Sequence, residues 1–284
     1  MRGFLVSNGG MMYEKRIMID EKIAGILTYP SCELKSTSQL PAVLMLHGFG
    51  TDKNEVANFY GDIAKQLADN NVISLRIDFR GYGESSGKAE CLSIDDMLDD
   101  AIKAFNHLVT LQSDPKKLGV IGFSLGAAIA LLLTQKVSFQ QLALLSPAVN
   151  LYDDFSGFLG QKTMEKLANC EKSIKVDLVW REINIGKDFY MSLKQCDPLS
   201  IAAKFNGNLL CIAGEKDFSA GNVKLICEKL SLANSTKEII ADADHVFNIT
   251  GLPNLATKTA QWLSFFLQSK STDSDTTKGH KCSL

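Results

Sequence analysis

A serine flanked by glycines has the residue types and the spacing of a covalent nucleophile. In this 284-residue chain it lies in the pentapeptide Gly122-Phe123-Ser124-Leu125-Gly126. A short apolar run typical of a buried strand precedes the motif, and Ala-Ala-Ile-Ala-Leu-Leu-Leu, typical of a buried helix, follows it. A serine on a sharp turn between the two holds its hydroxyl clear of the sheet, and the glycines leave room for both elements. An ordinary glycine-rich turn is the alternative, but this context favours an activated serine.

A serine hydroxyl needs a histidine that accepts its proton, and that histidine needs an acid to hold its tautomer. With the nucleophile on such a strand–helix turn, the expected chain order is serine, acid, histidine. Of the four histidines, His107 precedes the serine within a helical pattern and His280 lies in a polar tail. His245 is therefore the expected base. The alternative is a hydrogen-bonded histidine of a surface loop.

The acid is predicted from its position after a strand. An apolar, strand-like run ends just before Glu215 and Asp217, and catalytic groups of open parallel sheets gather at the carboxyl ends of strands. Asp217 is the expected partner of His245, and Glu215 on the same loop is its nearest rival. Asp242 and Asp244 are too close to His245 in sequence to approach its Nδ1 easily, so we interpret them as loop-shaping or solvated charges.

An oxyanion site is predicted where another apolar run, residues 42–46, ends in His47-Gly48-Phe49. A turn at this place points backbone N–H groups at the nucleophile. The expected donors are the amides of Phe49 and Leu125, the second aided by the positive end of its helix. His47 is expected to tie loops together through hydrogen bonds rather than to act as a second base.

The motifs as a set resemble those of a known superfamily. The segment between the oxyanion turn and the serine adds Asp78-Phe79-Arg80-Gly81-Tyr82-Gly83-Glu84-Ser85. In this order the motifs resemble those of α/β-hydrolases, and most of all small cinnamoyl/feruloyl-type esterases and serine aminopeptidase-type hydrolases, over about residues 13–268. The resemblance implies a serine esterase that acts through an acyl-enzyme, without a metal or an organic cofactor. A thioesterase, an aminopeptidase, a lysophospholipase or a non-catalytic ligand-binding protein are the alternatives.

The elements that must position these residues follow from the hydrophobic pattern. Residues 13–19 and 23–29 predict an antiparallel hairpin at the sheet edge. Predicted strands near 42–47, 72–78, 117–123, 141–147, 208–213 and 237–241 then alternate with predicted helices near 54–69, 93–111, 125–136, 221–233 and 254–268. This alternation predicts an α/β fold with a mostly parallel central sheet and helices on both faces. Ser93 is the expected N-cap of the second helix.

Residues 149–199 interrupt the alternation, between core segments 11–148 and 200–268. We interpret them as an inserted lid over the site. The alternative, which accounts for most of its aromatic residues, is simple packing against the body. Three aromatic residues are expected to touch an apolar acyl or aryl group: Phe155, Phe158 and Trp180. Residues 1–10 are expected to form a flexible leader, and the polar residues 269–284 a disordered tail.

Composition agrees with a single large α/β domain. Hydrophobic residues make up 45% of the chain, which is ample for an independent core. A net charge of −2 argues against a nucleic-acid partner, and no apolar run has the length of a membrane span. The seven cysteines lack metal-ligand spacing, so we expect reduced thiols, no metal site and a cytoplasmic location. The expected partner is a small-molecule ester, and a homodimer is left open.

Overall fold

A nine-stranded sheet forms the centre of the protein. The computed structural model describes residues 4–7, 10–30, 40–178 and 181–269. The strand order is β1-β2-β3-β5-β4-β6-β7-β10-β11. In chain order these strands are β1 (Phe4–Ser7), β2 (Gly10–Ile19), β3 (Ile23–Pro30), β4 (Ala42–Leu46), β5 (Ile73–Ile77), β6 (Leu118–Phe123), β7 (Gln141–Leu145), β10 (Asn208–Gly214) and β11 (Ser235–Ile240).

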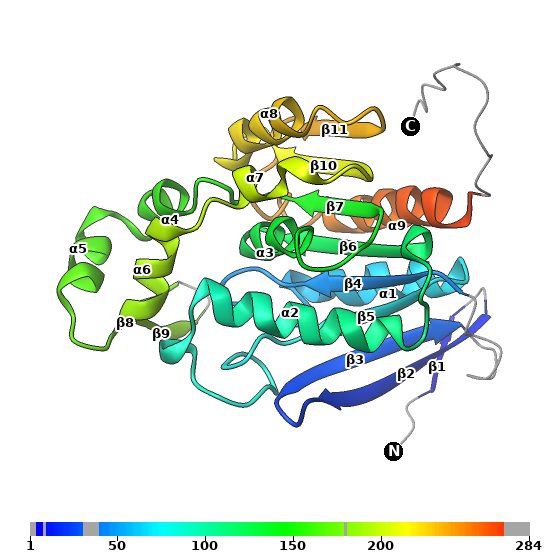
Figure 1. The fold of residues 1–284 in the computed structure, drawn as a ribbon, viewed down its shortest axis with the longest axis horizontal. Helices are drawn as coiled ribbons and strands as arrows, with labels where there is room; N and C mark the ends of the chain where they lie inside the picture. The colour runs from blue at the N-terminus through cyan, green and yellow to red at the C-terminus, as the bar shows by residue number, and fades with distance from the viewer. Residues whose placement is uncertain (1–3, 8–9, 31–39, 179–180, 270–284) are drawn as a thin grey trace.

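The sheet is antiparallel at one end and parallel through the rest. Strands β1, β2, β3 and β5 pair antiparallel, whereas every pairing from β5 through β4, β6, β7 and β10 to β11 is parallel. The predicted mostly parallel sheet with an N-terminal antiparallel hairpin is confirmed. Because parallel strands end at the same edge, the loops after β4, β6, β10 and β11 gather along one side of the molecule (Figure 1).

Helices cover both faces of the sheet, as the alternation predicts (Figure 1). Helices α1 (Phe59–Asp69) and α9 (Leu252–Gln268) pack together on one face, and α2 (Ile94–Val109), α3 (Leu125–Leu133) and α8 (Ser219–Leu230) lie on the other. Side chains of β4 alternate between the layers, since Val43 and Met45 join the α1–α9 core while Leu44 and Leu46 join the other. Both faces of the strand are buried, which explains its continuous apolar run.

The helix predicted near 54–69 begins later and after an irregular turn. A short 3-10 turn, η2 (Val56–Asn58), precedes α1 at Phe59. Glu55, Ala57 and Asn58 all have positive φ, so the chain cannot continue the helix backwards through them. In contrast, α2 begins as predicted: Ser93 and Asp96 form a reciprocal capping box at its N-terminus.

The first residues differ from the expected flexible leader. Phe4–Ser7 form strand β1, which pairs antiparallel with β2 from Phe4 opposite Tyr13 to Ser7 opposite Gly10. An apolar run beside an otherwise unpaired sheet edge can satisfy its backbone by adding a strand. The sheet therefore extends further toward the N-terminus than the pattern predicted. The predicted tail, beyond residue 269, lies outside the described residues.

Residues 149–199, called the cap segment below, lie beyond the carboxyl ends of the parallel strands, at the left of Figure 1. The segment contains α4 (Leu151–Leu159), α5 (Gln161–Asn169), the hairpin β8 (Ser173–Asp177) and β9 (Glu182–Gly186), and α6 (Lys187–Gln195). Helix α7 (Pro198–Ile201) leads back to the body. The Asp154 carboxylate joins α4 to α8, since its Oδ2 accepts a hydrogen bond of 3.0 Å from Asn222 Nδ2.

The described helices do not include a candidate membrane span, because none combines the required length with the required apolar character. The cytoplasmic location and the homodimer remain predictions.

Candidate active site

Ser124 occupies a strained turn between β6 and α3. Its φ of 52° and ψ of −115° lie where residues with a side chain are rarely found. The backbone around it is held from three sides: Ser124 N–H donates to the Leu145 carbonyl at 2.9 Å, and its carbonyl accepts from Ala127 at 3.0 Å and Ala148 at 3.2 Å. A Cβ on Gly126 would collide with the carbonyl oxygens at the end of β4, so only glycine permits this helix–strand approach.

The structure brings Ser124, His245 and Asp217 into one hydrogen-bonded row. His245 Nε2 lies 3.0 Å from Ser124 Oγ, and His245 Nδ1 lies 2.9 Å from Asp217 Oδ2. Each residue follows the carboxyl end of a parallel strand: β6 for the serine, β10 for the aspartate and β11 for the histidine. The Asp217 side chain is almost wholly buried, whereas that of His245 is 34% exposed. This arrangement can move a proton from the hydroxyl to the imidazole.

Two serines outside the row fix its members. Ser219 Oγ donates a short hydrogen bond to Asp217 Oδ2, the same oxygen that faces the imidazole. Ser146 Oγ donates to the His245 backbone carbonyl at 2.8 Å, across 99 residues of sequence. The acid and the base are therefore each held by a second polar group. Neither serine was predicted, since an isolated serine in a loop carries no distinctive pattern.

The other acidic side chains of the loops that carry Asp217 and His245 bind other partners. Glu215 Oε2 accepts from the Asp242 amide at 3.0 Å, and the Asp242 carboxylate pairs with Lys216 at 2.9 Å. Asp244 Oδ1 accepts from the Asn248 amide at 2.7 Å and so closes its own turn. Within the residues that the structure covers, none of the three forms a hydrogen bond with the His245 ring. The rival acid Glu215 binds the Asp242 amide, and Asp242 and Asp244 make contacts of the kind expected of loop-shaping charges.

The predicted oxyanion turn passes directly beside the serine. A Cβ placed on Gly48 would lie 3.3 Å from the Ser124 Cβ, which is a tight contact. The turn can therefore approach the serine this closely because Gly48 has no side chain. The Gly48 amide is already used, because it donates to Glu55 Oε1. In the part of the chain that the structure describes, the Phe49 amide donates to no other group. The Leu125 amide begins α3 and therefore has no acceptor one turn earlier.

Glu55 is a buried acid beside this turn that the sequence analysis did not single out. Its carboxylate accepts from the Gly48 amide, from Thr51 Oγ1 at 2.9 Å and from the Val56 amide at 3.2 Å. Burial raises the pKa of Glu55 to about 7, although these hydrogen bonds and the nearby His245 act in the opposite direction. Its only sequence signal is an acid soon after a His-Gly turn, which is also common among solvated acids.

His47 links the turn to the loop after β5. Its Nε2 accepts from the Phe79 amide at 3.1 Å, so Nδ1 carries the proton and donates to the Gly48 carbonyl at 2.8 Å. Burial lowers the pKa of His47 and favours this neutral form. It makes the loop-tying contacts expected of it.

The buried Asp78 carboxylate makes a second link between the two loops. It accepts from the Lys53 amide at 2.7 Å and the Glu84 amide at 2.8 Å, and it pairs with Lys53 Nζ at 2.6 Å. The Asp78–Ser85 motif thus shapes the loops beside the site.

Three phenylalanine rings connect the oxyanion turn to the cap segment. The Phe49 ring stacks on Phe189 at 5.1 Å and meets Phe155 edge-on at 5.1 Å. All three rings are buried. Phe155, one predicted substrate contact, therefore lies against the residue whose amide is a candidate oxyanion donor. Phe158, the second, is 46% exposed and lines a cavity of about 320 Å³ between α4, α5 and β8. Trp180, the third, lies outside the described residues.

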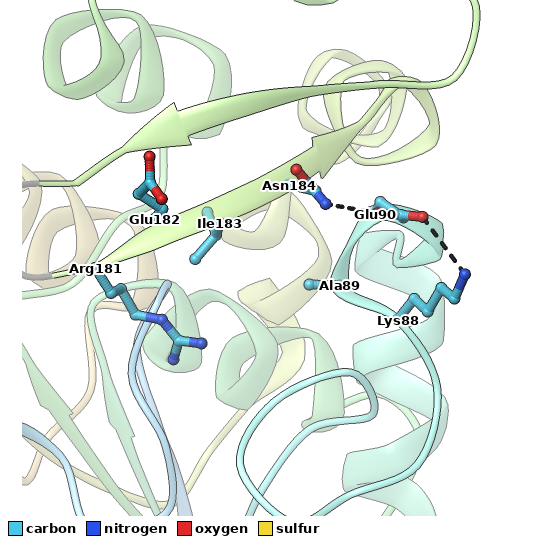
Figure 2. Close-up of a pocket in the computed structure, with 7 residues that line it drawn as sticks. All are labelled: Lys88, Ala89, Glu90, Arg181, Glu182, Ile183 and Asn184. Carbon is cyan, nitrogen blue, oxygen red and sulfur yellow. Dashed lines mark hydrogen bonds and ion pairs between the residues drawn. The ribbon is translucent and has the colours of Figure 1, made fainter.

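A larger cavity, of about 500 Å³, lies beside the cap hairpin (Figure 2). Its lining comes from β9 and from the segment around the short turn η3 (Ala89–Cys91), where Asn184 donates to Glu90 at 2.9 Å. Arg181, just before β9, extends from the opposite side and reaches the Gly50 carbonyl at 3.4 Å. The lining of this polar cavity includes none of the three residues of the hydrogen-bonded row. Within the described ranges, no cluster of histidine, cysteine or acidic side chains could hold a metal ion.

The sequence of this chain matches a known family over more than half of its length. A family model described as serine aminopeptidase, S33, matches residues 38–204, which is more than half of the chain. The chain belongs to this family of α/β-hydrolases.

Curated relatives of this α/β-hydrolase are more distant. Esterase EstD of Thermotoga maritima is 23% identical over 256 residues, which cover 84% of this chain and 61% of EstD. A probable alcohol acetyltransferase of Cyberlindnera jadinii is 26% identical over 210 residues, which cover 70% of this chain and 54% of that protein. The chain thus spans less than two thirds of the length of either relative.

Solved structures share the fold at low sequence identity. Est1E from Butyrivibrio proteoclasticus has a TM-score of 0.69 and 14% identity, with 94% of this chain and 99% of that chain covered. A putative hydrolase from Agrobacterium vitis has a TM-score of 0.70 and 16% identity, with coverages of 89% and 98%. These similarities establish the α/β-hydrolase fold for nearly the whole chain.

Proposed function

We propose that this protein is a serine hydrolase that cleaves carboxylic esters of small to medium acyl or aryl acids through an acyl-enzyme. The observation that carries the proposal is the row Ser124–His245–Asp217, with separations of 3.0 and 2.9 Å, at a strained turn beside two backbone amides. The esterase name of EstD supports it. The small-molecule ester remains the proposed partner.

Acylation begins when Ser124 Oγ attacks the ester carbonyl carbon. His245 Nε2 takes the hydroxyl proton, while Asp217 accepts the hydrogen bond from Nδ1–H and stabilises the imidazolium. The amides of Phe49 and Leu125 hold the oxyanion that forms on the carbonyl oxygen. The C–O bond to the alcohol then breaks, His245 returns the proton to the alcohol oxygen, and the acyl group stays on Ser124.

Deacylation repeats these steps with water. His245 removes a proton from the water as its oxygen attacks the acyl carbon, and the same two amides hold the second oxyanion. The bond to Ser124 Oγ breaks, His245 protonates that oxygen, and the carboxylic acid leaves. Each side chain thus returns to its initial state without an added cofactor.

The acyl group is proposed to lie against the rings of Phe49, Phe155 and Phe189, so that the cap segment acts as a lid. Each Å² of apolar surface buried there contributes roughly 25 cal/mol, which favours short apolar or aryl acids. Ferulic acid, an aryl acid, has been captured in a complex with Est1E. The same chemistry applied to thioesters, amides or lysophospholipids is the alternative, and a panel of p-nitrophenyl esters, acyl-CoAs and aminoacyl amides separates these classes.

The nucleophile is tested directly with a fluorophosphonate and with Ser124→Ala. We expect the wild-type protein to be labelled at Ser124 alone, and the variant to lose both the label and about 10⁴- to 10⁶-fold in kcat. Ser200→Ala, which removes an exposed hydroxyl from α7, is the control and should retain both. Full hydrolysis of p-nitrophenyl esters by Ser124→Ala would refute the proposed function.

A further inference from the structure

We propose that Phe218 selects the alcohol part of the ester and that it favours alcohols carrying an aromatic ring. This inference rests on the proposed function and refines it, because it concerns the leaving group rather than the acid. Phe218 follows Asp217 directly in sequence, before α8 begins.

The ring of Phe218 lies on the imidazole of His245. The two ring centroids are 5.1 Å apart and the planes differ by 21°, which is a stacked arrangement. Phe123 meets the imidazole edge-on at 5.6 Å and 70°. Phe123 is buried, at 4% exposure, whereas Phe218 is 43% exposed. The imidazole therefore contacts one ring that belongs to the core and one ring that is partly exposed to solvent.

This position is next to the departing alcohol. His245 Nε2 must come within hydrogen-bond distance, about 3 Å, of the alcohol oxygen in order to protonate it. A substituent on that oxygen then lies within a few Å of the imidazole edge. Since the Phe218 ring covers one face of the same imidazole, its exposed surface lies within reach of the substituent. An aromatic substituent can stack on that surface or meet it edge-on.

The other aromatic rings of the site lie elsewhere. Phe49, Phe155 and Phe189 are buried against one another between the oxyanion turn and the cap segment. They suit the acyl side, because under the proposed function the Phe49 amide binds the carbonyl oxygen of the substrate. Phe218 is on the side of the base, and among the described residues its aromatic contact is with His245. The two halves of the ester thus meet different aromatic surfaces.

The test measures kcat/KM for three butyrate esters whose alcohols differ in shape: benzyl, cyclohexylmethyl and ethyl. The ratio kcat/KM depends on the steps up to the departure of the alcohol and not on deacylation, so it reports on the leaving group. Ratios between esters cancel any general effect of a substitution on His245. We expect Phe218→Ala to lower the benzyl-to-ethyl ratio of kcat/KM about tenfold. A change of this size corresponds to the loss of one aromatic contact and of the apolar area that it buries. Phe218→Leu should retain the cyclohexylmethyl-to-ethyl ratio but lower the benzyl-to-cyclohexylmethyl ratio.

Leu225→Ala is the matched control, because Leu225 is 41% exposed on α8 and its loss should leave all three ratios unchanged. The ratio of ethyl hexanoate to ethyl butyrate, which varies only the acid, should also stay constant in Phe218→Ala. An unchanged benzyl-to-ethyl ratio in an active Phe218→Ala enzyme overturns the inference and leaves the proposed function intact. An equal change in Leu225→Ala, or a larger change in the acyl ratio, also overturns it. Absence of phosphonate labelling and of any ester hydrolysis in the wild-type protein would instead defeat the proposed function.

Discussion

The turn at residues 47–55 and the cap segment border the same site, but different forces hold them. Buried carboxylates hold the turn: Glu55 accepts three hydrogen bonds, and Asp78 accepts from Lys53. Ring contacts hold the cap segment against it, chiefly those of Phe155 and Phe189 with Phe49. Hydrogen bonds to charged groups are directional and fix an amide closely, whereas apolar contacts are not directional and tolerate repacking. Under the proposed function, the rigid region positions charge and the packed region adapts to the acyl group.

Asp217→Asn is the substitution with the largest expected effect, and it tests the hydrogen-bonded row Ser124–His245–Asp217 that the turn and the cap segment border. The amide should favour the wrong tautomer of His245 and lower kcat at neutral pH by about 10⁴-fold. The Asp242 carboxylate pairs with Lys216 and the Asp244 carboxylate closes its own turn, so Asp242→Asn and Asp244→Asn should each cost less than tenfold. A larger loss in Asp244→Asn than in Asp217→Asn would mean that the wrong loop supplies the acid. Steady-state kinetics on one p-nitrophenyl ester suffices for the comparison.

Glu55→Gln sharpens the comparison at the turn itself. Glutamine keeps the shape but turns an N–H group toward donors, so the turn should shift and kcat should fall roughly 10- to 100-fold. KM should change little. Glu165→Gln, which alters an exposed carboxylate on α5, is the control. Unchanged kcat in Glu55→Gln would show that the turn keeps its place without the carboxylate.

The raised pKa of Glu55 also predicts how stability depends on pH. Burial raises this pKa from 4.5 to about 7 in the folded protein, so the folded state holds the proton more tightly than the unfolded state. The contribution to stability is present below pH 4.5 and is lost as the pH rises to 7, by on the order of 3 kcal/mol. Urea unfolding at pH 4.5 and 7.5 should show this loss in the wild-type protein and a smaller loss in Glu55→Gln. Equal losses in the two proteins would contradict the burial argument.

Phe155→Leu should produce the smallest effect, because it acts on the adaptable region. Leucine retains most of the apolar contact with Phe49, so kcat for an acetyl ester should stay within about twofold. KM for a hexanoyl ester should rise a few-fold, because the apolar surface proposed to bind the acyl group changes shape. Phe265→Leu, which alters an exposed ring on α9, is the control and should change neither value. A large fall in kcat for all esters would mean that the ring contacts also position the oxyanion turn.

Much of the fold could be predicted because its signals are local. The apolar strands alternate with amphipathic helices, and the capping box at Ser93 marks the start of α2 to the residue. The candidate row could be predicted because each member directly follows a strand-like run, and parallel strands end at one edge. The structure brings Ser124, Asp217 and His245 together across 121 residues of sequence, as the order of the motifs predicts.

The features that sequence reasoning missed depend on tertiary neighbours. Nothing around Glu55 distinguishes an acid that binds the Gly48 amide from one that is solvated. Phe218 directly follows the predicted acid, but its stacking on His245 depends on where the β11 loop returns. The β8–β9 hairpin is short and half-exposed, so its alternation is weak within a segment of mixed composition. The one signal that the sequence offered for Phe218 was an aromatic residue directly after a predicted catalytic acid.

Helix α3 carries the nucleophile turn, and every one of its residues is buried. The hydrogen-bonded amide protons beyond its first turn should therefore exchange with solvent mainly when the domain opens as a whole, whereas those of the half-exposed β8–β9 hairpin can exchange through local opening. The turn that carries Ser124 thus adjoins a more durable cooperative unit than the cap hairpin does. Under the proposed function, mild heating or low denaturant would consequently alter which esters fit before it removed the capacity of Ser124 to react.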